Sequence, residues 1–213
     1  MTTQLLVMAK APVPGRVKTR LCPPCTPHQA ARLAAAALTD TLATVRATPA
    51  ARRVLVLAGV LARPPAGVQL LPQRGDGLAD RLAAAFADTA APGTASFVAG
   101  MDTPQLSVAL LTVALRRLAT ADAVLGMAAD GGWWGLGLRD PRHAAALRDV
   151  PMSTAETGQR TLAALTARGL DVAPLPELRD VDTFADAVAV ARLAPRSRFA
   201  ATLAQLRPNA EAR

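Results

Sequence analysis

A cluster of positive charge in one short loop is the first feature of this 213-residue sequence that suggests chemistry. Residues 10–21 read KAPVPGRVKTRL and hold both lysines of the chain, and every other basic residue is arginine. The prolines and Gly15 shape and stiffen this backbone. The alternative, a solvated basic loop, does not explain why both lysines fall here. We therefore predict that the loop binds a di- or triphosphate through four cations, Lys10, Arg16, Lys18 and Arg20.

Two aspartates follow apolar runs that predict buried strands. Asp102 stands in the sequence GMDTP, where its carboxylate oxygens could hold a hard cation. The alternative is that Asp102 or Thr103 caps the helix that follows. Asp182, in the sequence RDVDT, is a candidate for a second metal-binding carboxylate, although Thr183 also begins an ordinary capping pair with Asp186.

Two glycine-rich segments complete the set of candidate binding loops. The sequence DGGWWGLG starts at Asp130, and its Trp133 and Trp134 could stack on a sugar or base and so contact an acceptor. The alternative is a hairpin whose tryptophans fill the core. Asp130 is the candidate for acceptor positioning or general-base work. In QRGDGLADR, Gly75 and Asp76 precede a helix whose amides could meet a nucleotide, or Asp76 is simply its N-cap.

Composition excludes several other classes of protein. Hydrophobic residues make up 51% of the chain and charged residues 19%, which excludes general disorder. The formal net charge is +8, but most arginines fall singly within Ala/Leu-rich helices, so we expect no nucleic-acid partner. No apolar stretch is long enough to span a membrane, and the N-terminus does not resemble a signal peptide. We expect a cytoplasmic protein without a membrane partner.

Common catalytic motifs are missing from the sequence. There is no P-loop, no GxGxxG fingerprint and no GxSxG elbow. His28 and His143 lie in settings that indicate surface or capping roles. Cys22 and Cys25 flank two prolines and are interpreted as ordinary loop thiols, since a zinc site would need two further ligands.

Hydrophobic periodicity predicts alternating strands and helices around these loops. A capping box at Thr26 predicts the start of the first helix. We predict strands at 4–9, 53–58, 69–72, 96–99, 123–128, 133–138 and 172–175, and helices at 27–46, from 78, 107–118, 142–148, 157–168 and 183–193.

This alternation predicts a single three-layer α/β/α domain with a mostly parallel sheet over residues 1–194. Residues 195–213 are predicted to form a basic, loosely packed C-terminal tail. Ligands of open α/β sheets bind at the carboxyl ends of the strands, which is where the candidate loops lie.

Six segments of the chain, five of them described above, together resemble a known family in order and in sequence. They are KAPVPGRVKTRL, QRGDGLADRL, GMDTPQL, DGGWWGLGL, MSTAETG and RDVDT, and they span residues 10–183. The chain is similar to the small bacterial GT-A-like transferases called radical-SAM/selenodomain-associated transferases. It departs from them at Met101, where the family has a small hydroxyl residue, and at Trp133, where tyrosine is common. The first loop is also similar to that of phospholactate guanylyltransferase.

The resemblance implies a nucleotide-diphospho-sugar transferase fold and a divalent metal. It implies that Asp102 binds Mg²⁺ or Mn²⁺, with Asp182 as a second ligand, and that Lys10, Arg16, Lys18 and Arg20 bind phosphates. Lys18 and the rest of the loop would also stabilise the charge that develops during the reaction.

We therefore expect a metal-dependent transferase that uses a nucleotide or nucleotide-sugar donor and a small-molecule acceptor. Glycosyl transfer from a nucleotide-diphospho-sugar is the first reaction to consider. The alternative is nucleotidylyl transfer, in which a phosphorylated acceptor attacks an NTP and pyrophosphate leaves. A third reading is a catalytically silent nucleotide-binding module.

Overall fold

The computed structural model describes residues 2–206 and shows one seven-stranded sheet between helices. The strand order is β3-β2-β1-β4-β6-β5-β7. Strand β6 runs antiparallel to both of its neighbours, β4 and β5, whereas the remaining neighbours pair in parallel. The strands are β1 (Thr2–Lys10), β2 (Arg52–Ala58), β3 (Gln69–Pro72), β4 (Thr94–Gly100), β5 (Ala123–Ala128), β6 (Trp133–Leu138) and β7 (Val172–Leu178).

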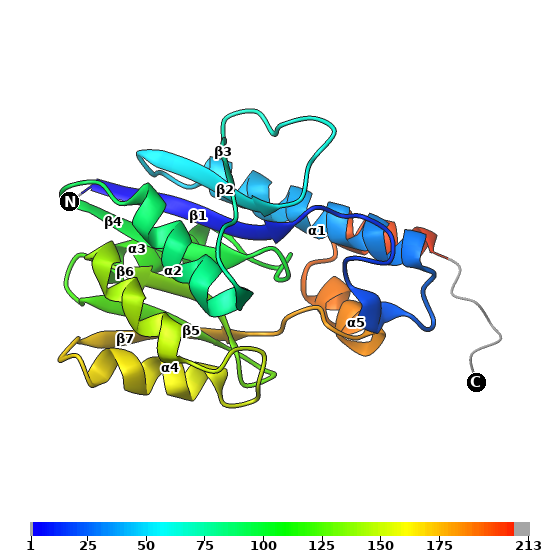
Figure 1. Cartoon of the computed structure of the whole chain (residues 1–213). Helices are drawn as coiled ribbons and strands as arrows, with labels where there is room; N and C mark the ends of the chain where they lie inside the picture. Colours follow the sequence, from blue (N-terminus) through cyan, green and yellow to red (C-terminus); the bar gives the residue numbers. More distant parts are fainter. Residues whose placement is uncertain (1, 207–213) are drawn as a thin grey trace.

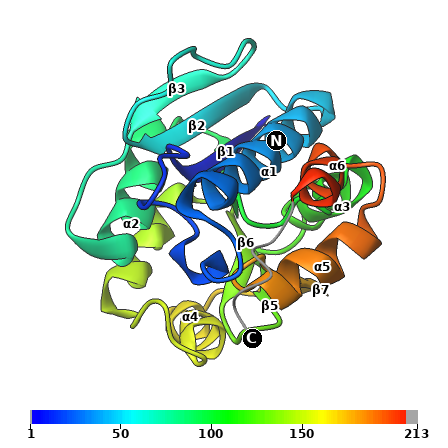
Figure 2. The same ribbon diagram turned by 90° about the vertical axis from the view of Figure 1, so that its right-hand side faces the viewer.

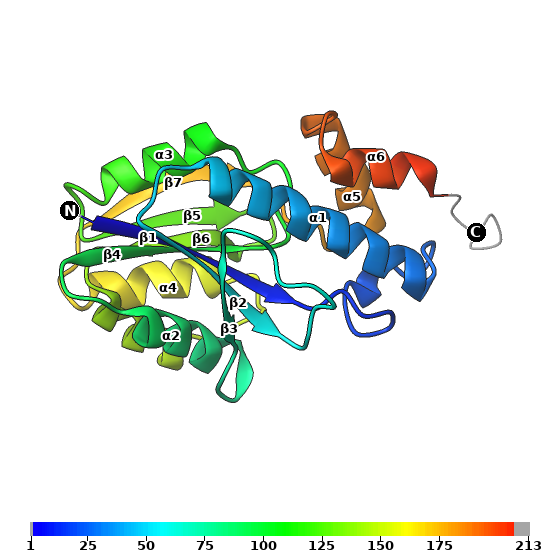
Figure 3. The ribbon, with the colours of Figure 1, turned by 90° about the horizontal axis from the view of Figure 1, so that it is seen from above.

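Helices cover both faces of this sheet, as the three-layer prediction requires. Figure 3 shows α1 and α3 over one face and α2 and α4 over the other. No helix within residues 2–206 is long and apolar enough to cross a membrane. The helices are η1 (Thr19–Leu21), α1 (Pro27–Ala47), α2 (Gly77–Thr89), α3 (Val108–Arg117), η2 (Pro141–Asp149), α4 (Thr157–Thr166), α5 (Phe184–Leu193) and α6 (Arg198–Gln205).

Each face of the sheet has its own hydrophobic core. Leu38 of α1 and Leu111 of α3 pack with Phe97 on one face, and Phe86 of α2 packs with Leu6 and Leu147 on the other. Burial of this apolar surface on both sides is the main force that holds the strands in one sheet. The strand ends are thereby fixed in relation to one another.

Helix boundaries follow the local signals in the sequence. Thr26 and Gln29 form the predicted capping box at α1, and Thr183 and Asp186 form the one at α5. The segment 142–148 differs from the prediction because it is a 3₁₀ helix. Helix α3 begins at Val108 behind an N-cap at Ser107, so neither Asp102 nor Thr103 caps it.

The predicted loose packing from residue 195 is wrong for α6. This helix packs against α1 and α5, and its Phe199 is buried with Leu33 of α1 and Val190 of α5. Figure 2 shows α6 beside α1. Its large apolar residues, Phe199 and Leu203, span a single helical turn, which is too little for periodicity to indicate burial. Residues 207–213 of the predicted tail lie outside the described residues.

Asp40 of α1 ties α6 to the domain, and its removal gives a first testable result. Its carboxylate accepts the backbone N–H groups of Arg198 at 3.1 Å and Phe199 at 2.8 Å. We expect Asp40→Ala to lower the free energy of unfolding in urea by about 1 kcal/mol, the usual cost of a lost helix cap. The matched control is Asp149→Ala, which removes an exposed carboxylate and should change the free energy of unfolding by no more than about 0.5 kcal/mol. Equal stability of both variants would show that the contact does not anchor α6.

Candidate functional site

One large cavity opens at the carboxyl ends of the parallel strands. Its volume is about 840 Å³, within the range of sites that hold small molecules and cofactors. Residues at the end of β1 and in the loops after β1, β4, β5 and β7 line it. Figure 1 shows that these four strands end on the same side of the sheet. The topology therefore gathers four sequence segments, the loops 10–21, 100–104, 130–133 and 180–183, in one place.

All four predicted cations of the first loop line this cavity, namely Lys10, Arg16, Lys18 and Arg20. Lys18 adopts a left-handed backbone conformation, with φ of 49°, directly before η1. The side chain of Lys18 is only 9% exposed, whereas that of Arg20 is 74% exposed. The loop thus presents one buried and several accessible positive charges to a ligand.

The remaining predicted nucleotide-binding residues do not line the cavity. Gly15 sits in a turn with φ of 75°, closed by a hydrogen bond from the Arg16 N–H to the Val13 carbonyl. Gly75 has a φ of 113° and its carbonyl accepts from Arg81, which does line the cavity. Asp76 occupies the N-cap position of α2 without a side-chain cap bond. Gly15, Gly75 and Asp76 therefore lie outside the cavity lining, and their role in nucleotide binding stays a prediction.

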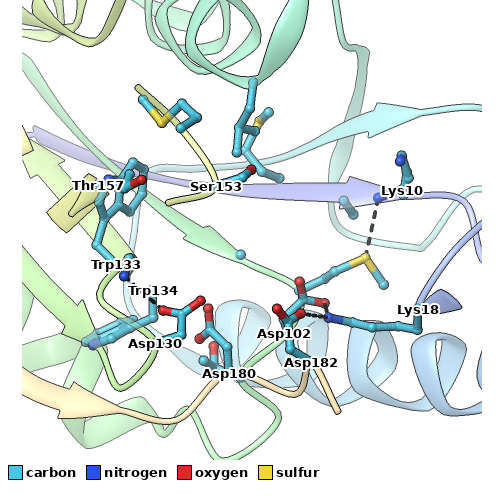
Figure 4. Close-up of a pocket in the computed structure, with 18 of the residues that line it drawn as sticks. Lys10, Lys18, Asp102, Asp130, Trp133, Trp134, Ser153, Thr157, Asp180 and Asp182 are labelled. Atoms are coloured by element: carbon cyan, nitrogen blue, oxygen red, sulfur yellow. Dashed lines mark hydrogen bonds and ion pairs between the residues drawn. The ribbon is translucent and has the colours of Figure 1, made fainter. Parts of the chain in front are cut away.

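Asp102 and Asp182 meet at the ammonium group of Lys18. The Lys18 Nζ lies 2.9 Å from Asp102 Oδ1 and 3.4 Å from Asp182 Oδ1, and Arg20 contacts the other Asp182 oxygen at 3.1 Å (Figure 4). A backbone hydrogen bond of 2.9 Å from Val181 N–H to the Asp102 carbonyl joins the two loops. Burial alone would lower the pKa of Lys18, but Asp102 above all, together with Asp182, raises it above its usual value.

Asp180 is a site residue that the sequence analysis missed. Its carboxyl group lines the cavity, and its Oδ1 is buried without a hydrogen-bond partner among the described residues. Burial, then the charges of Asp102 and Asp130, raises the pKa of Asp180 to about 7, although Lys18 opposes the shift. The Asp-Val-Asp pattern of the sequence could have identified Asp180. Alternate residues of an extended segment share a side, so Asp180 lies on the same side as Asp182 while Val181 between them is buried.

The glycine-rich segment forms the turn of the β5–β6 hairpin. Asp130 Oδ1 accepts the Gly132 N–H at 2.9 Å, which fixes this turn while the carboxylate lines the cavity. Trp133 also lines it, and its indole N–H donates to Thr161 Oγ1 at 3.1 Å. Asp130 and Trp133 are thus positioned to meet a ligand.

The prediction that Trp134 stacks on an acceptor must be corrected. It borders the cavity, but its side chain is 2% exposed, its ring centroid lies 5.9 Å from that of Phe97, and its indole N–H donates to the Pro176 carbonyl at 3.0 Å. Strand alternation puts Trp134 on the opposite face from Trp133. The predicted alternative, a hairpin tryptophan in the core, describes Trp134.

The segment MSTAETG, to which the sequence analysis assigned no role in the site, contributes the wall opposite the carboxylates. Met152, Ser153 and Thr154 line the cavity, and Ser153 has a φ of 60°. The hydroxyl of Thr157 at the start of α4 donates to the Pro151 carbonyl at 2.9 Å and so holds this loop in place. Figure 4 shows Ser153 facing the cavity across from Asp102 and Asp182.

Gly131 allows the hairpin turn to pack against this loop. Its carbonyl accepts the Gly158 N–H at 2.8 Å, its φ is 88°, and an added Cβ would lie 2.0 Å from the Ala155 carbonyl oxygen. We expect Gly131→Ala to lower the free energy of unfolding in urea by about 2–4 kcal/mol. Gly169→Ala is the matched control, because φ is 76° there but the space is open, and should cost only about 1–2 kcal/mol. Similar losses in both variants would contradict the steric account.

The carboxylates fit a hard divalent cation held jointly with a ligand. Within residues 2–206, no three His, Cys, Asp or Glu side chains are arranged to enclose a metal. Asp102 and Asp182 nevertheless converge on one positive charge, and the buried Asp180 Oδ1 has no partner within the same part of the chain. Because Mg²⁺ is commonly held by one or two carboxylates together with substrate phosphates, two converging carboxylates are a suitable donor set.

Comparison with protein families and curated proteins gives one match. Residues 31–154 match the family described as "Uncharacterized protein conserved in bacteria (DUF2064)". A comparison with curated proteins finds no match.

Solved structures share the fold over nearly the whole chain. A proposed nucleotide-diphospho-sugar transferase from Desulfovibrio desulfuricans G20 is 27% identical, covers 96% of this chain and 95% of its own, and has a TM-score of 0.86. The manganese complex of Rv0371c from Mycobacterium tuberculosis H37Rv is 21% identical, with coverage of 89% and 97% and a TM-score of 0.58. A 2-C-methyl-D-erythritol 4-phosphate cytidylyltransferase from Thermus thermophilus is 19% identical, with coverage of 92% and 100% and a TM-score of 0.55. These likenesses confirm the predicted fold.

Proposed function

For this chain, which belongs to the DUF2064 family, we propose the activity of a metal-dependent transferase that uses a nucleotide donor. One observation carries the proposal: buried and accessible cations of the loop 10–21 share a single cavity with the carboxylates of Asp102 and Asp182. The similarity to the proposed nucleotide-diphospho-sugar transferase from D. desulfuricans supports the same class of reaction.

The loop cations would bind the donor's phosphates. Lys10, Arg16 and Arg20 line the cavity around Lys18, and together they can neutralise several phosphate oxygens. Because they belong to one short loop held at the end of β1, they need little rearrangement to act. The density of positive charge suits both a diphosphate and a triphosphate.

The carboxylates of Asp102 and Asp182 would hold Mg²⁺ or Mn²⁺ beside those phosphates. A cation bound there supplies charge stabilisation at the donor's phosphate oxygens. Asp182 is additionally oriented by Arg20. The manganese complex of the similarly folded Rv0371c is consistent with this assignment.

The acceptor would lie at the other end of the cavity, near Asp130 and Trp133. The Asp130 carboxylate can accept a hydrogen bond from an acceptor hydroxyl and draw its proton towards itself. Trp133 offers part of an indole face, and the loop with Ser153 closes the opposite wall. These side chains would orient the acceptor towards the donor.

Glycosyl transfer is the reaction that we place first. An acceptor oxygen forms a bond to the anomeric carbon of the donor sugar, the bond from that carbon to the phosphate oxygen breaks, and a nucleoside diphosphate leaves. The acceptor proton passes to a base, for which Asp130 is the candidate. Lys18 and its neighbouring cations stabilise the negative charge on the leaving diphosphate.

Nucleotidylyl transfer is a second candidate, favoured by the number of cations in the loop 10–21. In this reaction an acceptor phosphate oxygen attacks the α-phosphorus of an NTP and pyrophosphate leaves. The cytidylyltransferase from T. thermophilus has the same fold. The same cations would then hold the pyrophosphate group.

Product analysis separates these candidates. The protein is incubated with Mg²⁺ and either nucleotide sugars or NTPs together with small hydroxylated or phosphorylated acceptors. Release of a nucleoside diphosphate from a nucleotide sugar supports glycosyl transfer, and release of pyrophosphate supports nucleotidylyl transfer. Tight binding of nucleotides without either product would identify a catalytically silent binding module and overturn the enzymatic proposal.

A further inference from the structure

The ammonium group of Lys18 stands where the two candidate metal-binding carboxylates converge. Its Nζ lies 2.9 Å from Asp102 Oδ1 and 3.4 Å from Asp182 Oδ1 (Figure 4). The neighbouring Val17 and Leu21 are buried, which anchors the backbone on either side of Lys18. The side chain therefore points inwards from a fixed position and carries a full positive charge into the site.

A divalent cation and this ammonium group compete for the same oxygens. Like charges a few ångströms apart repel strongly in a partly buried site, so the cation cannot bind between the carboxylates while Lys18 remains there. If Lys18 simply left, its charge would need another partner, because unpaired buried charge is costly. Donor phosphates in the same cavity would be such a partner.

We propose that Lys18 is an internal counter-ion that keeps the cation site closed until donor phosphates draw its ammonium group away from Asp102 and Asp182. The inference rests on the proposed function, because it assumes that phosphates enter this cavity. In the exchange the carboxylates pass to the divalent cation and the ammonium group passes to the phosphates. Every charge keeps a partner, so the cation and the nucleotide bind together rather than separately.

The chemistry of lysine suits this exchange. Lysine carries a compact charge on a flexible four-carbon stem, so its head can move while the anchored backbone stays in place. Arg20 also pairs with Asp182, but its side chain is 74% exposed and its charge is screened by solvent. Lys18 alone bridges both carboxylates among the ion pairs of the described chain.

Mn²⁺ affinity in the absence of nucleotide tests the proposal directly. Free Mn²⁺ is titrated by electron paramagnetic resonance against the wild type, Lys18→Met, Lys18→Arg and the matched control Arg142→Met, which removes an exposed partner of Asp140 outside the cavity. Folding is checked by thermal unfolding. We expect Lys18→Met to bind Mn²⁺ at least about tenfold more tightly than the wild type. Lys18→Arg, which keeps the charge, and Arg142→Met should stay within about threefold of the wild type. Unchanged or weaker Mn²⁺ binding by folded Lys18→Met overturns the inference.

A second readout uses the wild type and does not depend on a variant. Because the chain has only two lysines, selective ¹³C labelling of lysine Cε gives two NMR signals, which Lys18→Arg assigns. Pyrophosphate added together with Mg²⁺ should shift the Lys18 signal as the ammonium group changes partners, whereas Mg²⁺ alone should leave the signal in place. Bound pyrophosphate with an unmoved Lys18 signal contradicts the inference alone. If neither pyrophosphate nor nucleotide binds, the proposed function is contradicted. The Mn²⁺ titration is measured without nucleotide, so its outcome for Lys18 does not depend on that result.

Discussion

Substitution of Asp102 by asparagine is expected to reduce turnover by about 10²–10³-fold and to abolish the effect of Mg²⁺ on nucleotide affinity. Asp102 follows β4, and its backbone carbonyl accepts a hydrogen bond from the Val181 N–H. Its carboxylate contacts the Lys18 ammonium group at 2.9 Å. The amide removes one negative charge from the point where the cation would bind, while it keeps the size of the side chain. Turnover is measured with the donor that releases product, and nucleotide affinity by calorimetry with Mg²⁺ or EDTA.

A matched carboxylate distinguishes this effect from a general change in charge. Asp88 at the end of α2 pairs with Arg74 outside the cavity. Asp88→Asn should leave both turnover and Mg²⁺-dependent binding unchanged. If Asp102→Asn kept Mg²⁺-dependent binding and turnover, the assignment of Asp102 as metal ligand would be wrong.

The pH dependence of stability is expected to carry the signature of Asp180. Its pKa is raised from 3.8 to about 7 by burial and by the charges of Asp102 and Asp130, so the native state binds a proton that the unfolded state releases. Asp180 therefore makes its full contribution to the free energy of unfolding of the metal-free protein below about pH 4. This contribution is lost as the pH rises towards 7. The loss amounts to about 2–4 kcal/mol.

Asp180→Asn tests this expectation because the amide does not ionise. The free energy of unfolding in urea is measured in EDTA between pH 4 and 8. Relative to the wild type, the variant should gain about 2–4 kcal/mol in stability as the pH rises across this range. Asp149→Asn, which removes an exposed carboxylate at the end of η2, is the control and should follow the wild-type profile to within about 0.5 kcal/mol. Parallel profiles of wild type and Asp180→Asn would contradict the raised pKa.

Most of the fold could be predicted because local signals and burial agree along the chain. Strands such as 123–128 and 133–138 are short apolar runs bounded by turn residues, and the structure has them at those positions. The antiparallel direction of β6 follows from the hairpin, which the sequence offered only as the alternative reading of the segment DGGWWGLG. The packing of helix α6 was not predicted because it depends on α1 and α5, and α1 lies far away in sequence.

The candidate site was predictable where residue type alone indicates chemistry. The cations of the loop 10–21 and the carboxylates of Asp102 and Asp182 are charged groups whose chemistry few other residue types share, and the strand ends bring them together in one cavity. Glycines are ambiguous: the close backbone approach of Gly75 to Asp80 is a packing reason for glycine, and the sequence does not distinguish this reason from contact with a ligand. Whether Trp134 and Asp180 belong to the site depends on the direction of their side chains. That direction is set by the register of the hairpin and by the conformation of the loop 180–182.

Nucleotide binding with and without Mg²⁺ tests the central claim most directly. Calorimetric titration of the wild type with nucleoside diphosphates, triphosphates and nucleotide sugars should show binding of at least one class. The affinity should rise when Mg²⁺ replaces EDTA and fall in Asp102→Asn only in the presence of Mg²⁺. Failure of all three classes to bind, with or without Mg²⁺, would contradict the account of this cavity as a nucleotide site.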